Sequence, residues 1–138
     1  MKILEWNDFI DLCNSLHKDL MAKNFDGIIS IGRGGTIVGA ILASKLGTRI
    51  HPVFVVHSGK GQGESPKIAQ LGITSDINGG RYLLVDDKCF TGETFTLLKK
   101  TLNNLNLETA SIFCNSHQYS PDYYAHSTEE ETIFPYEI

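Results

Sequence analysis

Two neighbouring aspartates, Asp86 and Asp87, stand in the stretch RYLLVDDKCFTGETF, residues 81 to 95, where an apolar run gives way to a threonine- and glycine-containing turn. Taken alone, such a pair most often closes a turn after a strand, because aspartate side chains bond readily to nearby backbone. Two carboxylates crowded beside a phosphate-binding turn would also suit Mg²⁺ or sugar hydroxyls, either of which relieves their mutual repulsion. The residues themselves leave both interpretations open.

Two glycine-containing stretches could bind an anion. GRGGT, residues 32 to 36, and DDKCFTGET, residues 86 to 94, each follow an apolar run and each precede a predicted helix. A helix start presents unpaired backbone N–H groups, and glycines let these groups close around a phosphate. Neither stretch has the spacing of a P-loop or of a dinucleotide-binding fingerprint, which disfavours those enzyme classes. For each stretch alone, a plain glycine turn is the alternative.

Arg33 lies within the first of these stretches. A guanidinium group beside flexible glycines is a bidentate partner for phosphate or pyrophosphate, whereas the simpler alternative is a surface arginine.

The elements that would position these residues alternate between helix and strand. Apolar periodicity predicts helices over residues 7 to 22, 36 to 46 and 94 to 105, and strands over 26 to 31, 49 to 58, 81 to 86 and 109 to 115. This order predicts an α/β fold with a mostly parallel sheet, in which ligands bind beyond the C-terminal ends of the strands.

Two segments depart from this alternation. Residues 59 to 80 are polar and glycine-rich, which predicts a mobile loop or lid with one hairpin strand around residues 68 to 74. The tail has two short apolar patches separated by the acidic run 129 to 131, and Pro135 limits its last strand to a sheet edge.

Length and composition favour a single folded domain, residues 1 to 138. The chain has 138 residues, of which 41% are hydrophobic and 20% charged, as in ordinary globular proteins. The net charge is −4 and no stretch concentrates lysine and arginine, so neither a nucleic acid polymer nor a membrane is an expected partner. The N-terminus does not resemble a signal peptide, and we expect a cytoplasmic location.

Cysteines and histidines indicate no metal centre. The three cysteines are odd in number and far apart, and the five histidines lack a metal-ligand spacing. We therefore predict buried or bystander thiols rather than disulfides or a zinc site.

Three stretches resemble the type I phosphoribosyltransferases. LLVDDKCFTGETF is similar to their signature, in which an apolar strand leads to two acidic residues and a Thr-Gly-x-Thr turn. ISIGRGGTIVGAILASKLG resembles their pyrophosphate-binding loop, especially in xanthine-guanine and hypoxanthine members, and PDYYA followed by FPYE resembles the end of short hypoxanthine-type enzymes. The resemblance covers about residues 24 to 138 in the family's order, which is more specific than any one match.

This resemblance implies a fold and an activity. The implied fold is a Rossmann-like sheet flanked by helices, with a flexible lid at about residues 59 to 80 and a small C-terminal hood. The implied reaction is the transfer of ribose 5-phosphate from phosphoribosyl pyrophosphate to a nucleobase, purine-like by overall resemblance, with Mg²⁺ as cofactor. A homodimer is also implied, and the apolar helix at 36 to 46 could contribute to it or be a core helix.

The resemblance also assigns roles to individual residues. Asp86 and Asp87 would bind the ribose hydroxyls, directly or through Mg²⁺ held by Asp87, and Arg33 with Gly34 would hold pyrophosphate. With Arg33, the two aspartates are the implied catalytic residues. The turn formed by Thr91, Gly92, Glu93 and Thr94 would bind the 5′-phosphate. Lys60 and Lys67 are candidate phosphate contacts from the lid.

The base-binding half departs from the family pattern. Phe90 replaces an aspartate that acts near the base in 6-oxopurine enzymes, Asn115 replaces a lysine, and Glu131 stands where the xanthine-guanine type has a stacking tryptophan. In the lid, the family's Ser-Tyr pair corresponds to Ser58 and Gly59. The implied base pocket contains Phe90, Asn115 and Thr132.

The departures keep three hypotheses open. Phe90 could pack against a base or against the core, but it cannot act as an acid or base. The leading hypothesis is a Mg²⁺-dependent phosphoribosyltransferase. The alternative is a regulatory module that binds phosphoribosyl pyrophosphate or a nucleotide without turnover, and a domain that serves only as a scaffold ranks last.

Overall fold

The computed structural model describes residues 1–57, 66–71, 77 and 79–137. Three α-helices are present in these residues: α1 (Trp6–Leu20), α2 (Gly32–Leu46) and α3 (Glu93–Thr101). The strands are β1 (Lys2–Ile3), β2 (Gly27–Ile31), β3 (Arg49–His57), β4 (Pro66–Leu71), β5 (Arg81–Cys89), β6 (Asn106–Cys114), β7 (Tyr123–Ser127) and β8 (Thr132–Ile133). A short 3₁₀ helix, η2 (Pro135–Glu137), closes the described chain.

The main sheet has six strands in the order β4-β3-β2-β5-β6-β7. Its pairings are parallel except that between β3 and β4, which is antiparallel. The order reverses around β2, because the chain goes from β2 outward to β3 and β4 and then returns to β5 on the other side of β2. Parallel neighbours need crossover connections, which α2 supplies between β2 and β3 and α3 supplies between β5 and β6.

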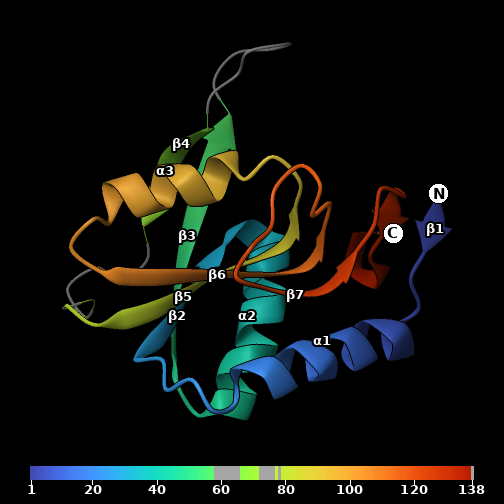
Figure 1. Cartoon of the computed structure of the whole chain (residues 1–138), viewed down its shortest axis with the longest axis horizontal. Helices are drawn as coiled ribbons and strands as arrows, with labels where there is room; N and C mark the ends of the chain where they lie inside the picture. The colour runs from blue at the N-terminus through green and yellow to red at the C-terminus, as the bar shows by residue number, and fades with distance from the viewer. Residues whose placement is uncertain (58–65, 72–76, 78, 138) are drawn as a thin grey trace.

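Helices cover both faces of the sheet, with α1 and α2 on one side and α3 on the other (Figure 1). The apolar spacing of α1 explains its packing, because its four buried residues, Phe9, Cys13, Leu16 and Leu20, recur every three or four positions on one face. Every residue of β2 is buried, as expected for a central strand covered on both faces. The core is accordingly divided into two layers, one on each side of the sheet.

The two ends of the chain meet beside the main sheet. β1 pairs in parallel with β8, with Lys2 opposite Thr132 and Ile3 opposite Ile133. Figure 1 shows this small sheet and η2 grouped at the side of the molecule where both termini lie. The C-terminal segment is thereby anchored by the first residues of the chain and extends toward the end of β5.

The fold class expected from the sequence is confirmed: the chain forms a mostly parallel sheet flanked by helices. Gly47 ends α2 in the left-handed conformation, with φ of 66°, as its place after the apolar pattern indicated. Cys13, Cys89 and Cys114 are free and buried, which confirms the prediction of buried thiols. Within the described residues, no helix is long and apolar enough to span a bilayer.

Several boundaries were wrong, among them the three that follow. Strand β5 does not end at Asp86, as predicted, but continues to Cys89, because it stays paired with β6 up to the register pair Cys89 and Cys114. The stretch 32 to 36, expected as a loop before a helix, is the first turn of α2. Helix α3 is shorter than residues 94 to 105 and ends at Thr101, before two asparagines that are poor helix formers.

The predicted lid lies partly outside the described residues. Its expected hairpin strand exists as β4, Pro66–Leu71, somewhat earlier than residues 68 to 74, and this strand contains Lys67. Lys60 and the Ser58-Gly59 pair lie outside the described residues.

Candidate functional site

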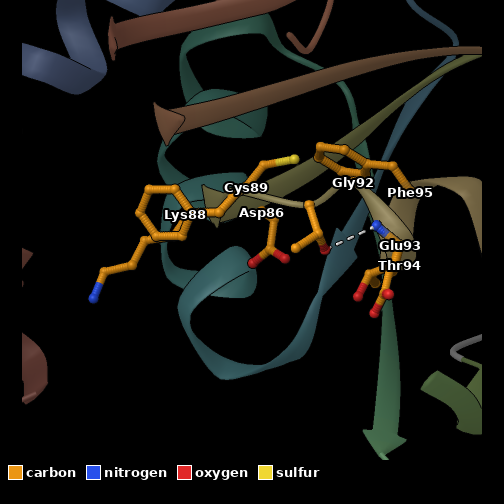
Figure 2. A pocket seen from close by; sticks show the side chains of 9 residues that line it. Asp86, Lys88, Cys89, Gly92, Glu93, Thr94 and Phe95 are labelled. Atoms are coloured by element: carbon orange, nitrogen blue, oxygen red, sulfur yellow. Dashed lines mark hydrogen bonds between the residues drawn. The ribbon is translucent and has the colours of Figure 1, made fainter. Parts of the chain in front are cut away.

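A cavity of about 330 Å³ opens at the C-terminal end of β5, where the loops of a doubly wound sheet gather. Its lining comes from one continuous stretch that ends β5 and begins α3: Asp86, Lys88, Cys89, Phe90, Thr91, Gly92, Glu93, Thr94 and Phe95. Figure 2 shows Asp86 between the turn at Gly92 and Lys88, whose side chain extends away from that turn. The cavity therefore has an acidic centre flanked by a helix start on one side and a cationic side chain on the other.

Gly92 shapes the turn that begins α3. It takes the left-handed conformation with φ of 76°, and a Cβ atom there would lie 2.3 Å from the ring of Tyr119. Both observations require glycine, because other residues meet strain at this φ and a clash with the ring. The hydroxyl of Thr91 accepts a 3.4 Å hydrogen bond from the N–H of Glu93 (Figure 2). The N–H groups of Thr94 and Phe95, next in the first turn, have no acceptor within the helix and are suited to an anion.

The two carboxylates at the cavity interact with each other. The backbone N–H of Asp87 donates a 2.8 Å hydrogen bond to Oδ1 of Asp86. Burial, together with the charge of the neighbouring carboxylate, raises the pKa of Asp86 well above its usual range. In the described part of the chain, neither aspartate has a lysine or arginine at ion-pair distance. The pair is therefore suited to bind a cation or hydroxyl donors.

Asp87 faces the start of α2 and the C-terminal segment. Its Oδ1 accepts the backbone N–H of Lys88 at 2.8 Å, and its Oδ2 accepts the hydroxyl of Tyr136 at 2.8 Å. A Cβ atom on Gly34 would lie only 1.9 Å from this Oδ2, so glycine is needed for α2 to start so close to the acid pair. The structure thus brings the two predicted glycine stretches together, with Asp87 between them.

Arg33 is exposed in the first turn of α2 and lies near the C-terminal segment. Burial alone would raise the pKa of Glu137, but hydrogen bonds from the Phe134 N–H and Lys88, together with the charges of Lys88 and Arg33, lower it. The hydroxyl of Thr36 bonds to Ser30 at 3.0 Å and to the carbonyl of Gly32 at 2.6 Å, which holds this turn on the end of β2.

The three residues of the expected base pocket lie in different surroundings. Phe90 lines the cavity with 36% of its surface exposed, so it is not tucked into the core. Oδ1 of Asn115 accepts the N–H of His117 at 3.2 Å in the turn that follows β6. Thr132 is buried at 4% exposure, in β8, and Glu131 is exposed beside it. Of the three, Phe90 alone is part of the cavity lining.

Several residues at the site lie within the quoted motifs but were given no role from the sequence. Lys88, Cys89 and Phe95 line the cavity, and Tyr136 and Glu137 contact the residues at its edge. Burial raises the pKa of the Cys89 thiol to about 12, which keeps it protonated and disfavours a nucleophilic role. The position of Lys88 beside the acid pair could have drawn attention to it, whereas the approach of Tyr136 depends on tertiary packing.

A divalent cation at this site would need ligands from outside the protein. Within the described residues, no group of three or more histidine, cysteine or acidic side chains could hold a metal ion. Mg²⁺ prefers hard oxygen ligands and is commonly bound by one or two carboxylates together with substrate phosphates and water. The uncompensated acid pair fits that arrangement.

Comparison with known proteins gives one family. A family model described as the phosphoribosyl transferase domain matches residues 2–135. The match confirms the resemblance carried by the three sequence stretches.

Individual relatives and structures agree with this match. The xanthine-guanine phosphoribosyltransferase of Chromohalobacter salexigens is 29% identical over 106 residues, which are 77% of this chain and 64% of the relative, so the chain spans less than two thirds of that protein. The crystal structure of purine phosphoribosyltransferase from Pyrococcus horikoshii superposes with a TM-score of 0.86 at 26% identity, covering 99% of this chain and 93% of that one. The xanthine-guanine-hypoxanthine enzyme of Helicobacter pylori shares the fold, with a TM-score of 0.82 at 16% identity over 99% of this chain and 94% of that one.

Proposed function

We propose, from the premise that this chain belongs to the phosphoribosyl transferase domain family, that it transfers ribose 5-phosphate from phosphoribosyl pyrophosphate to a purine-like nucleobase. In this reaction the bond from ribose C1 to the pyrophosphate oxygen breaks, a bond from C1 to a base nitrogen forms, and the base loses its N–H proton to solvent. The names of relatives that act on purines support this acceptor class.

One observation carries the proposal: Asp86 of the acid pair and an anion-binding helix start share one cavity, and Asp87 follows Asp86 directly in β5. Asp86 and the residues Thr91, Gly92, Glu93 and Thr94 line the same 330 Å³ space. A sugar phosphate has hydroxyls and a phosphate group separated by one pentose ring, which matches a carboxylate centre beside a phosphate cup. A phosphorylated sugar therefore fits the arrangement of acid and helix start.

The roles follow from position. We assign the 5′-phosphate to the N–H groups and hydroxyls of residues 91 to 94, and the ribose hydroxyls to Asp86 and Asp87. Pyrophosphate would meet Arg33 and the backbone of Gly34 at the start of α2, where the helix dipole favours an anion. Such contacts stabilise the negative charge that develops on pyrophosphate as the C1 bond breaks.

A divalent cation, Mg²⁺ in our proposal, would be held by Asp87 together with oxygens of the substrate. It would supply positive charge for the departing pyrophosphate. The 2.8 Å hydrogen bond from the Tyr136 hydroxyl uses one lone pair of Asp87 Oδ2. The ionised carboxylate retains further lone pairs for a ligand.

The acceptor would bind at the Phe90 end of the cavity. Phe90 exposes 36% of its surface there and can pack against a flat ring, and Lys88 also lines the cavity. Asn115 and Thr132 stay proposed base-pocket residues, reached only if the acceptor extends toward the hood. The change from an acid to Phe90 leads us to expect an altered preference among bases rather than the loss of stacking.

Pyrophosphate release from phosphoribosyl pyrophosphate and Mg²⁺, measured with a panel of purines, pyrimidines and orotate, tests this function. We expect turnover with at least one purine. Binding of phosphoribosyl pyrophosphate in a calorimeter without turnover on any base would instead favour the regulatory module. The absence of both binding and turnover would exclude the enzyme and the regulatory module alike.

We also propose a homodimer located in the cytoplasm. The core role of α2 accounts for its buried residues Val38, Leu42 and Ala43 without a partner, so the dimer rests on the family resemblance. Light scattering of the purified chain would measure its mass in solution, and a mass near one chain, 15.3 kDa, would contradict the dimer.

A further inference from the structure

The C-terminal segment reaches the acid pair through a single hydroxyl. Tyr136 lies in η2, and its hydroxyl donates a 2.8 Å hydrogen bond to Oδ2 of Asp87, 49 residues earlier in the chain. The contact crosses from the hood side of the molecule to the end of β5. It was not suggested by any of the sequence motifs.

The ring of Tyr136 is fixed by aromatic neighbours from both ends of the chain. It stacks on Phe134 with ring centroids 5.2 Å apart and planes 6° from parallel. Phe9 of α1 meets it edge to face at 5.5 Å, and Trp6 lies at 6.4 Å. Because these contacts set the ring's position, the hydroxyl is delivered to Asp87 by the core rather than by a free side chain.

A second contact ties the same segment to β5. Oε1 of Glu137 accepts hydrogen bonds from the backbone N–H of Phe134 at 2.9 Å and from the ammonium of Lys88 at 3.1 Å. The Lys88 ammonium also lies 5.1 Å from the centroid of the Phe134 ring. These contacts hold η2 against the end of the strand that bears the acid pair.

Asp87 itself has few ways to turn. Oδ1 is bonded to the Lys88 N–H, while Oδ2 lies between the Tyr136 hydroxyl and the space that a Gly34 side chain would fill. Without the tyrosine hydroxyl, Oδ2 would lose its hydrogen-bond donor and the carboxylate could rotate about its terminal bond. The rotated carboxylate would no longer present the same lone pairs to a ligand at the cavity.

We propose that Tyr136 is a positioning residue, which orients the Asp87 carboxylate for binding the sugar and cation of phosphoribosyl pyrophosphate. The proposal rests on the proposed function for the identity of the ligand, but the orientation of Asp87 can be examined without any ligand. It also makes the aromatic cluster of Trp6, Phe9 and Phe134 a support for the site, and not only part of the core.

The substitution Tyr136→Phe removes the hydroxyl and keeps the ring with its packing. A matched control is Tyr123→Phe, because the hydroxyl of Tyr123 also donates a 2.8 Å hydrogen bond to a carboxylate, that of Glu108, at the opposite end of the sheet. Both variants lose one tyrosine–carboxylate hydrogen bond, so thermal unfolding should show similar, small losses of stability.

The two variants should differ in ligand affinity. Because the Asp87 carboxylate loses the donor that holds its orientation, we expect Tyr136→Phe to weaken calorimetric binding of phosphoribosyl pyrophosphate with Mg²⁺ by roughly tenfold or more. Tyr123→Phe should leave the dissociation constant within about twofold of the wild type. Equal affinity of wild type and Tyr136→Phe would overturn the positioning role, since a purely structural tyrosine predicts lost stability alone.

Crystal structures of wild type and Tyr136→Phe without ligand give the second readout. We expect the Asp87 carboxylate to turn or to become disordered in the variant while the surrounding backbone stays in place. An unchanged, ordered Asp87 would overturn the inference. If Asp87 turns in the variant but wild type binds no phosphoribosyl pyrophosphate, the positioning role stands and the proposed function fails.

Discussion

The carboxylates at the two ends of the main sheet differ in whether a cation lies beside them. At the N-terminal end, Glu108 receives a 2.5 Å ion pair from Arg81 and a hydrogen bond from Tyr123, and Asp26 accepts the Arg81 N–H at 2.8 Å. At the C-terminal end, Asp86 has its pKa raised by burial and by a second carboxylate, with no cation at ion-pair distance in the described residues.

This difference separates charges that support the fold from charges prepared for a ligand. A paired carboxylate gains stability from its partners, whereas a crowded, partly buried one costs stability until something binds it. Functional sites often contain groups whose pKa values are strongly shifted by burial and by a neighbouring like charge. The cavity beside Asp86 is consistent with this tendency. Substitutions matched between the two ends should therefore have opposite consequences.

The largest effect is expected at Asp87. Replacing Asp87 by asparagine removes a negative charge from the proposed cation and ribose site, and we expect kcat/KM for pyrophosphate release to fall by about 100-fold or more. Glu108→Gln, the same chemical change at the other end of the sheet, should leave kcat/KM within about threefold. Similar losses in both variants would show that the two ends do not differ in function.

A second pair of substitutions compares two left-handed glycines. Gly92 and Gly47 have φ of 76° and 66°, but a Cβ would clash with Tyr119 at Gly92 and would meet nothing within 4 Å at Gly47. Changing either to alanine should cost about 1–2 kcal/mol of unfolding free energy because of the positive φ, and the clash with Tyr119 should add to this cost at Gly92. Only Gly92→Ala should also weaken binding of phosphoribosyl pyrophosphate, by about tenfold, since the phosphate turn must move; calorimetry on both variants would decide.

The unliganded protein should become more stable when Asp86 is replaced by asparagine. The folded state holds the Asp86 proton more tightly than the unfolded state, so wild-type stability falls as pH rises from the ordinary pKa of 3.8 toward the raised folded value. We expect a gain of about 1–2 kcal/mol at pH 7 in urea unfolding, together with lost activity.

Asp122→Asn is the matched control for that gain. Oδ2 of Asp122 accepts the backbone N–H and the hydroxyl of Thr109 at 2.9 and 3.1 Å, so its replacement should lower stability by about 1 kcal/mol. A loss of stability in Asp86→Asn as well would mean that the acid pair is not strained without ligand.

The smallest effect concerns Cys13, which belongs to neither end of the sheet. Burial raises its pKa from 9.0 to about 11, although Lys45 acts in the opposite direction. Between these pH values the unfolded thiol ionises while the folded one keeps its proton, so stability falls as pH rises, by about 1 kcal/mol for this group at pH 10. Cys13→Ala should show a correspondingly flatter change between pH 8 and pH 10 in urea unfolding, and an unchanged slope would contradict the assignment.

Much of the fold followed from local patterns. The alternation of apolar runs predicted the strands β2, β3, β5 and β6 and the helices between them, because a buried strand and an amphipathic helix have different periods. Boundaries were less well predicted. The continuation of β5 through Asp86 to Cys89 depends on hydrogen bonds with β6, which lies about 25 residues further along the chain.

The candidate site was predicted only in part for the same reason. The lining residues Asp86 and 88 to 95 belong to one short stretch, so their shared cavity could be anticipated from one motif. The close approach of Gly34 to Asp87 and the bond from Tyr136 join segments that are 53 and 49 residues away in the chain. No local pattern specifies such distances.

By itself, the sequence determined the α/β alternation, the family and the acid pair beside a glycine turn, since these depend on residue type and short spacing. The tertiary structure alone decided that the start of α2 and a tyrosine from the chain's end both meet Asp87. The physical reason is that side-chain periodicity acts over a few residues, whereas the place where two distant segments touch is set by the packing of the whole sheet and its helices.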